Sequence, residues 1–196
     1  MTIRRRWLGA SIAAALWWSA CGPADDVSDP PAPPSVDEVP ALTNESPITL
    51  TGTAEAGALV TVRGGAASPV DALANDDGSF SIEVELHPDA ENTLRVSQTV
   101  GELESDAVTL TVRHDGTPPA VPALRPVISP TRRPHQRIRG TTEPHAAIRI
   151  TGGAEEATGT ANDAGEFAIV VPLRTTDAGT VDNELRVVAT DAAGNA

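Results

Sequence analysis

Few side chains in this sequence are of the types that usually do chemistry. The chain has one cysteine, which could carry a covalent group, and four histidines, which could bind a metal or transfer a proton. The sequence has no Gly-x-Ser-x-Gly motif and no phosphate-binding loop. The histidines fall in predicted loops and linkers without the spacing of metal ligands: His87, His114, His135 and His145. We therefore predict no catalytic residue and expect a protein that is not an enzyme.

The cysteine stands at the end of a targeting pattern. Residues 1–20 contain three consecutive arginines, an uncharged apolar run, and the small residues Ser19 and Ala20 directly before Cys21. This order is typical of a secretory signal peptide. The apolar run is shorter than the about 20 residues that a membrane-spanning helix needs. We predict a cleaved signal peptide over residues 1–20.

Ser19, Ala20 and Cys21 resemble the lipobox of a bacterial lipoprotein signal, with Trp18 at the position that usually holds leucine. The resemblance implies lipidation of Cys21, a palmitate-bearing membrane anchor, and a place in the cell envelope. Gly22 follows the cysteine where an aspartate would imply retention at the inner membrane. The outer membrane or the cell surface is therefore implied. The alternative is an ordinary signal peptide with an incidental cysteine.

A segment rich in proline and acidic residues follows, over residues 21–46. It lacks periodic apolar residues, so it cannot bury enough surface to offset the entropy lost on folding. We predict a disordered tether, which could hold the next domain up to roughly 75 Å from the membrane if extended.

Alternating apolar and polar residues then predict short strands over residues 47–115. Gly52 interrupts the first of these strands and predicts a bend or bulge. The turn Asn75-Asp76-Asp77-Gly78 leads into the clearest alternation, which begins at Phe80. About seven short strands separated by turns are typical of a β-sandwich.

The same pattern returns over residues 135–196, after a proline-rich linker at 116–134. Buried-face positions and turn glycines match between the copies, as a duplicated fold requires. The only two phenylalanines, Phe80 and Phe167, occupy the same position of the repeat. We predict that both are structural anchors of a core. The second copy has no counterpart of residues 106–113, so we expect it to lack its last strand and to leave a strand edge open near residues 185–190.

Five short motifs carry a resemblance to a known family. They read Gly-Thr-x-Glu-x-Gly, Val-x-Val, Asp-x-Gly-x-Phe, Asn-x-Leu-x-Val and Asp-x-Ala-Gly-Asn. The second copy has counterparts of them all, with Ile148 and Ile150 for Val-x-Val and His145 in place of the first motif's last glycine, whereas the first copy lacks Asp-x-Ala-Gly-Asn. The motifs resemble those of the bacterial immunoglobulin-like repeats of surface proteins and adhesins. The resemblance implies an all-β fold of tandem immunoglobulin-like β-sandwiches.

Some relatives bind Ca²⁺ near domain ends, so the resemblance makes calcium the one metal to consider. The candidate ligands lie in two acidic turns and at two domain ends: Asp76, Asp77, Asp115, Asp163 and Asp191. Calcium requires six to eight oxygen ligands, and turn formation alone also explains the turn residues. Both interpretations stay open at this point.

Charge separates along the chain. The formal net charge of -13 disfavours nucleic acid as a partner. A basic stretch nevertheless runs through the linker into the second copy, and it consists of Arg113, Arg125, Arg132, Arg133, Arg137, Arg139 and Arg149. These arginines could contact acidic polysaccharide, lipid headgroups or the acidic first copy, or they could be solvated.

The sequence thus favours a non-enzymatic, lipid-anchored envelope protein. It would present two immunoglobulin-like modules as a spacer or as an adhesion element that binds a polysaccharide or a surface protein. The alternative is the N-terminal scaffold of a longer exported enzyme or carbohydrate-active protein.

Overall fold

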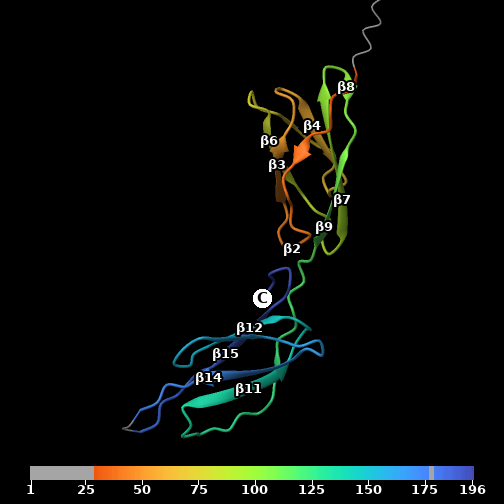
Figure 1. Ribbon diagram of the computed structural model, residues 1–196. Coiled ribbons are helices and arrows are strands. Elements are labelled where there is room, and N and C mark those ends of the chain that lie inside the picture. The colour runs from red at the N-terminus through yellow and green to blue at the C-terminus, as the bar shows by residue number, and fades with distance from the viewer. Residues whose placement is uncertain (1–28, 177–178) are drawn as a thin grey trace, which may run out of the picture.

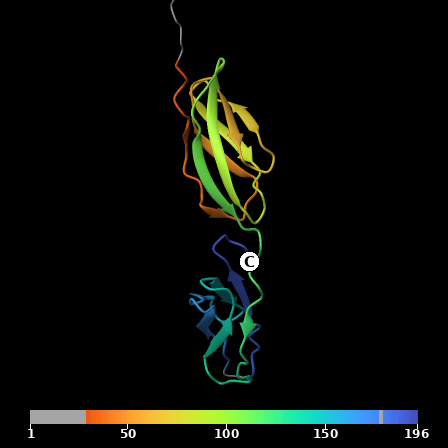
Figure 2. The ribbon, with the colours of Figure 1, turned by 90° about the vertical axis from the view of Figure 1, so that its right-hand side faces the viewer.

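The computed structural model describes residues 29–176 and 179–196. These residues form two β-sandwiches that follow one another along the molecule (Figure 1, Figure 2). The predicted signal peptide and Cys21 lie outside the described residues. None of the described residues belongs to a helix that is long and apolar enough to cross a membrane. The predicted all-β fold with two sandwiches is confirmed.

Two sheets make up the first sandwich. One has the order β1-β3-β6, formed by Ser35–Val36, Ile48–Thr53 and Ser79–Val84. The other has the order β2-β9-β7-β4-β5, formed by Leu42–Thr43, Val108–His114, Glu91–Val100, Leu59–Arg63 and Val70–Leu73. The short β8, Leu103–Glu104, pairs with the end of β7.

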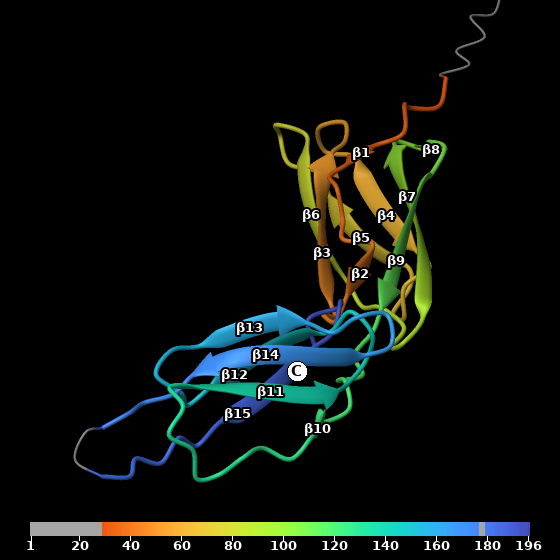
Figure 3. The same cartoon turned by 60° about the horizontal axis from the view of Figure 1, so that its bottom comes forward.

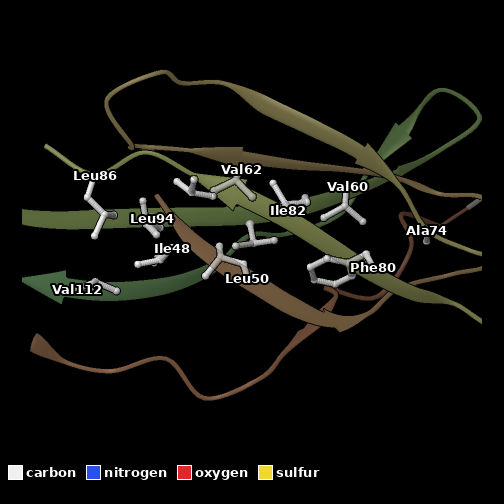
Figure 4. Close-up of a cluster of buried hydrophobic side chains, with 12 residues drawn as sticks. Ile48, Leu50, Val60, Val62, Ala74, Phe80, Ile82, Leu86, Leu94 and Val112 are labelled. Atoms are coloured by element: carbon white, nitrogen blue, oxygen red, sulfur yellow. The ribbon is translucent and has the colours of Figure 1, made fainter. Parts of the chain in front are cut away.

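The core of the first sandwich follows from the period-2 alternation of these strands. Along β3 and β6, buried and exposed residues alternate, so one face of each strand points to the other sheet. Figure 4 shows these apolar side chains filling the space between the two sheets, with Phe80 at one end and Val112 at the other. Leu50, Val60 and Leu94 are fully buried at the centre.

The second sandwich repeats this plan with fewer strands. Its first sheet has the order β10-β11-β14, formed by Ala123–Leu124, His135–Thr141 and Glu166–Pro172. Its second has the order β13-β12-β15, formed by Ala157–Thr160, Ala147–Thr151 and Arg186–Thr190. Among the described residues, β15 pairs only with β12, so its other edge carries no neighbouring strand.

A glycine faces each phenylalanine across the strand pair, and this explains why both copies have a glycine within the strand. Gly52 on β3 pairs with Phe80, and Gly140 on β11 pairs with Phe167. A Cβ at Gly52 would lie 2.9 Å from the ring of Phe80, and a Cβ at Gly140 would lie 2.7 Å from the ring of Phe167. The predicted bend or bulge at Gly52 is wrong, since the strand is continuous there. A Cβ would also meet the backbone carbonyl of Ser35 at Gly52 and that of Ala123 at Gly140, so each glycine makes room for the backbone of the neighbouring strand as well as for the ring.

Three short strands lie where no strand was predicted. β1 and β2 fall inside the predicted tether of residues 21–46, and β10 falls inside the predicted linker of residues 116–134. β1 pairs with β3, β2 pairs in parallel with β9, and β10 pairs with β11. The first sandwich therefore begins at Ser35 or earlier, and the second begins by Ala123. These segments satisfy the backbone groups of edge strands, which requires no hydrophobic periodicity.

Candidate functional site

The histidines form no catalytic or metal-binding group among the described residues. His87, His135 and His145 are exposed. His114 differs from the prediction, because it ends β9 and is buried, where its Nδ1 accepts a hydrogen bond of 3.1 Å from the backbone N–H of Asp89. Within the described part of the chain, no three His, Cys, Asp or Glu side chains lie close enough together to hold a metal ion.

Three of the candidate calcium ligands lie in two separate turns. Asp77 Oδ1 accepts hydrogen bonds from the hydroxyl of Ser79 at 2.7 Å and from its backbone N–H at 2.9 Å, and these bonds lower the pKa of the Asp77 carboxyl. Asp76 lies beside it in the same exposed turn. Asp163 is exposed in the matching turn of the second sandwich, 3.6 Å from Nε2 of His145. The turn chemistry accounts for Asp77.

The other two candidates meet where the sandwiches join, at the turn formed by residues 191–195. The side-chain amide of Asn195 donates to the carbonyl of Asp115 at 2.7 Å and to Oδ2 of Asp191 at 2.8 Å. Its carbonyl oxygen accepts a hydrogen bond of 3.1 Å from the amide of Asn44, which belongs to the first sandwich. Asn195 is only 8% exposed, so these bonds form largely away from water. One side chain of the second sandwich thus bonds to Asn44 of the first sandwich and to Asp115, the residue directly before the linker.

Asp191 is the electrostatic centre of this turn. Burial acts to raise the pKa of the Asp191 carboxyl, but hydrogen bonds from the Asn195 side chain and from the backbone N–H groups of Asn195, Gly194 and Ala193 outweigh it. The pKa therefore lies below its ordinary value. The ionised carboxylate is the form that holds the turn closed.

The junction residues do not fit a calcium ion as they are arranged. Asp115 offers its main-chain carbonyl, and Asp191 offers a carboxylate. The amide nitrogen of Asn195 lies between these oxygens and donates to both, so it occupies the place that a cation would take. Calcium would also require several more oxygens around it.

The first sandwich binds its incoming segment in a parallel way. The side-chain amide of Gln98 donates to the carbonyl of Ala32 at 2.6 Å, and its oxygen accepts from the backbone N–H of Glu55 at 2.7 Å. Gln98 is 3% exposed. Each sandwich therefore holds the chain segment that enters it by a buried carboxamide, Gln98 in one and Asn195 in the other. A buried amide left without these partners would be costly, so both segments are held firmly.

The basic stretch identified in the sequence divides in three. Arg113 lies on β9 of the first sandwich. Arg149 lies on β12, in the second sheet of the second sandwich, with its guanidinium 3.7 Å from Glu156. The remaining arginines lie on or beside β11, in the other sheet, and we call them the arginine face: Arg125, Arg132, Arg133, Arg137 and Arg139.

The arginine face belongs to the sheet β10-β11-β14, whose strands lie side by side in Figure 3. Arg137 and Arg139 are exposed and alternate with the buried Ile138. Across the strand pair they face Val170 and Ala168, which carry no charge. Beside Arg125 and Arg139, a shallow hollow of about 330 Å³ is also lined by Thr160, Asn162, Glu166 and Phe167.

Comparison with known families agrees with this architecture. Residues 31–114 and 125–196 each match the family model described as bacterial Ig domain. The chain belongs to the bacterial Ig domain family. The two matched segments include β1 and nearly reach β10, in agreement with the early start of each sandwich in the structure.

Three solved structures match most of this chain at low sequence identity. The first is titled as the host cell surface retention of a 1.5-MDa bacterial ice-binding adhesin, at 16% identity and a TM-score of 0.39, covering 83% of this chain and 60% of that one. The second is a Ca²⁺-stabilized adhesin with which an Antarctic bacterium binds ice, at 15% identity and a TM-score of 0.42, covering 84% and 46%. The third is the BSP domain of a biofilm associated protein, at 18% identity and a TM-score of 0.29, covering 82% and 29%.

The chain thus spans 60% or less of the length of each of these structures. A search of curated proteins found no match.

Sequence reasoning missed two residues that bind across long distances in these bacterial Ig domains. Asn44 and Gln98 each have their partner far away in the sequence, 151 and 66 residues off. Asn44 belongs to no periodic pattern, and Gln98 continues the buried alternation of Leu94 and Val96 as a polar residue, which the apolar pattern does not register. Asn195 had a signal, since it ends the Asp-x-Ala-Gly-Asn motif, but its partners could not be inferred from the motif alone.

Proposed function

We propose that this protein is a lipid-anchored envelope protein that presents two bacterial Ig domains as a spacer or adhesion element. The observation that carries the proposal is the junction at Asn195, whose side chain bonds to Asn44, Asp115 and Asp191 at once. Such a junction resists bending between the sandwiches, which suits a part that must hold a binding surface at a distance. Family membership supports this role but does not fix it, because this architecture serves many functions.

The anchor would be Cys21, lipidated after removal of residues 1–20. Multiple acyl chains on one cysteine would give stable anchoring, whereas a single chain binds membranes only marginally. The segment from Cys21 to Pro31 would extend over at most roughly 40 Å before Ala32 is bonded to Gln98. This is shorter than the sequence predicted, because the later part of the predicted tether belongs to the first sandwich.

Membrane fractionation of cells that express the chain tests this proposal. We expect the wild-type protein in the membrane fraction and in the detergent phase of a Triton X-114 partition. Cys21→Ala should move it to the soluble exported fraction, because no acyl chain can then be attached. Ser28→Ala, a change of similar size in the tether, serves as the control and should not alter the distribution. Retention of Cys21→Ala in the membrane fraction would refute lipid anchoring.

A further inference from the structure

The arginine face has more positive charge than the described residues neutralise. Only Arg125 has an acidic partner, Glu166 at 3.2 Å, and both members of that pair are more than half exposed. Arg132, Arg133, Arg137 and Arg139 form no ion pair with any described residue and are exposed. By contrast, Arg63 on the first sandwich is paired with Glu104 at 2.8 Å.

The matching face of the first sandwich shows that the fold does not require these arginines. Thr49 and Thr51 on β3 occupy the positions of Arg137 and Arg139 on β11. Glu83 on β6 faces Thr49, where Val170 on β14 faces Arg137. The same sheet is therefore neutral to acidic in one copy and basic in the other. Charge that neither the fold nor an internal partner needs is available to an external ligand.

The geometry of the face is linear. Arg137 and Arg139 lie two residues apart on one strand, so their side chains leave the sheet in the same direction, about 7 Å apart. Arg125 lies at one end, where its backbone N–H donates to the carbonyl of Arg139. Arg132 and Arg133 lie near the other end, because Pro134 is hydrogen-bonded to Leu173 there. The backbone positions of the arginines thus spread over roughly 20 Å along β11 and the residues before it.

We propose that the arginine face binds a linear acidic polysaccharide, with its carboxylate or sulfate groups on the guanidinium groups. A guanidinium matches a carboxylate or sulfate with two parallel hydrogen bonds, so a row of arginines matches a chain of regularly spaced anions. The hollow beside Arg125 and Arg139 adds the hydroxyl of Thr160 and the amide nitrogen of Asn162, which suit sugar hydroxyls, while the Glu166 carboxylate in its lining is paired with Arg125. This proposal rests on the proposed function, since it names the class of molecule that the adhesion element would bind.

Other anionic partners fit less well. An anionic membrane is a plane and would also approach the rest of this acidic chain, whose formal charge is -13. A single polymer chain needs to contact only the arginine face. The described residues include no Trp and no Tyr, which usually anchor proteins at membrane interfaces and in protein interfaces.

Binding of the purified full chain to polygalacturonate and to heparin tests this proposal, with dextran as the neutral polymer. Arg137→Thr with Arg139→Thr installs the residues of the first sandwich at the matched positions. We expect this double variant to bind at least about tenfold more weakly. The dependence of affinity on salt should fall by about two counter-ions. The matched control, Arg149→Thr with Arg186→Thr, removes the same charge from the other sheet and should bind like the wild type.

Three outcomes would overturn the proposal. The first two are no binding of the wild type to either acidic polymer at low salt and equal weakening in both double variants. The third, from a parallel measurement with phosphatidylglycerol vesicles, is binding to the vesicles alone. Far-UV circular dichroism checks folding, and Arg137→Gln with Arg139→Gln provides a second test if the threonine variant unfolds. Because the assay is done in solution, it does not depend on anchoring. Its failure would leave the Cys21 fractionation result unaffected.

Discussion

The first sandwich buries a core of 12 hydrophobic side chains among the described residues, whereas the second buries a smaller set (Figure 4). The difference lies at one sheet edge. Leu94 and Val96 on β7 are fully buried, because β7 lies between β4 and β9. The matching Leu185 and Val187 are only partly buried, because the described strands cover β15 on one side alone. The shared pattern of buried positions forms both sandwiches, but a neighbouring strand decides how completely the core is closed.

The buried phenylalanines offer the largest test of this difference. Removing either ring, in Phe80→Ala or Phe167→Ala, should cost about 3–5 kcal/mol of stability. The second sandwich has the smaller core, so we expect Phe167→Ala to unfold it while Phe80→Ala leaves the first sandwich folded with a lower Tm. Because the described residues have no Trp or Tyr, hydrogen exchange read by mass spectrometry should follow peptides from β6 and β14.

Val170→Ala provides the control for Phe167→Ala. Val170 lies on the same strand but is 47% exposed, so its loss should change stability by less than about 0.5 kcal/mol. If Phe80→Ala exposes β6 while Phe167→Ala leaves β14 protected, the ranking of the two cores is wrong.

The same comparison shows what could be predicted from the sequence. The long strands β3, β6, β11 and β14 could be predicted because their alternation is a local signal of a half-buried sheet. The equivalence of Phe80 and Phe167 in the two repeats could be predicted because the sequence contains no other phenylalanine. These two features were enough to identify the duplicated sandwich.

Other elements gave no local signal. β1, β2 and β10 are two residues long and lie in proline-rich segments, so they show no periodicity. They form because edge strands offer unpaired backbone groups, which only the folded structure reveals. The bond between Asn44 and Asn195 likewise depends on how the sandwiches meet. The arginine face was visible in the sequence only as a basic stretch. The strand pairing was needed to show that Arg137 and Arg149 lie in different sheets.

Changes at the junction should have an effect of intermediate size on stability, and they compare the two buried carboxamides, Asn195 and Gln98. Asn195→Ala removes the bonds to Asn44, Asp115 and Asp191 and should weaken the junction by about 1–3 kcal/mol. We expect the two sandwiches to bend more freely, which small-angle X-ray scattering would record as a broader distribution of distances. Asn44→Ala, which removes only the bond between the sandwiches, should show a smaller change in the same direction.

Gln98→Ala is the matched control at the other end of the first sandwich. It should free the segment at Ala32 without changing how the two sandwiches are arranged, because the side chain of Gln98 bonds only to Ala32 and Glu55. Unchanged scattering from Asn195→Ala would mean that the junction is held by other contacts.

Lowering the pH should have the smallest effect on stability. Of the two buried carboxamides, it should change the hydrogen bonds of Asn195 and leave those of Gln98 intact. The pKa of Asp191 is lowered in the folded protein, so its contribution to stability is present above the unfolded pKa of about 3.9 and is lost as the pH falls through the folded value. Protonation would weaken the hydrogen bonds that Asp191 accepts from Asn195, whereas the partners of Gln98 do not titrate.

The pKa of Glu104 is also lowered, first by a hydrogen bond from Ser97 and then by Arg63, so the first sandwich responds to acid as well. A local measurement is therefore needed, and the side-chain amide signals of Asn195 and Gln98 in nitrogen-15 NMR provide one. We expect the Asn195 signals to shift below about pH 4 while those of Gln98 stay fixed. In Asp191→Asn the acid-dependent shift of Asn195 should disappear. A shift that persists in this variant would show that another group controls the turn.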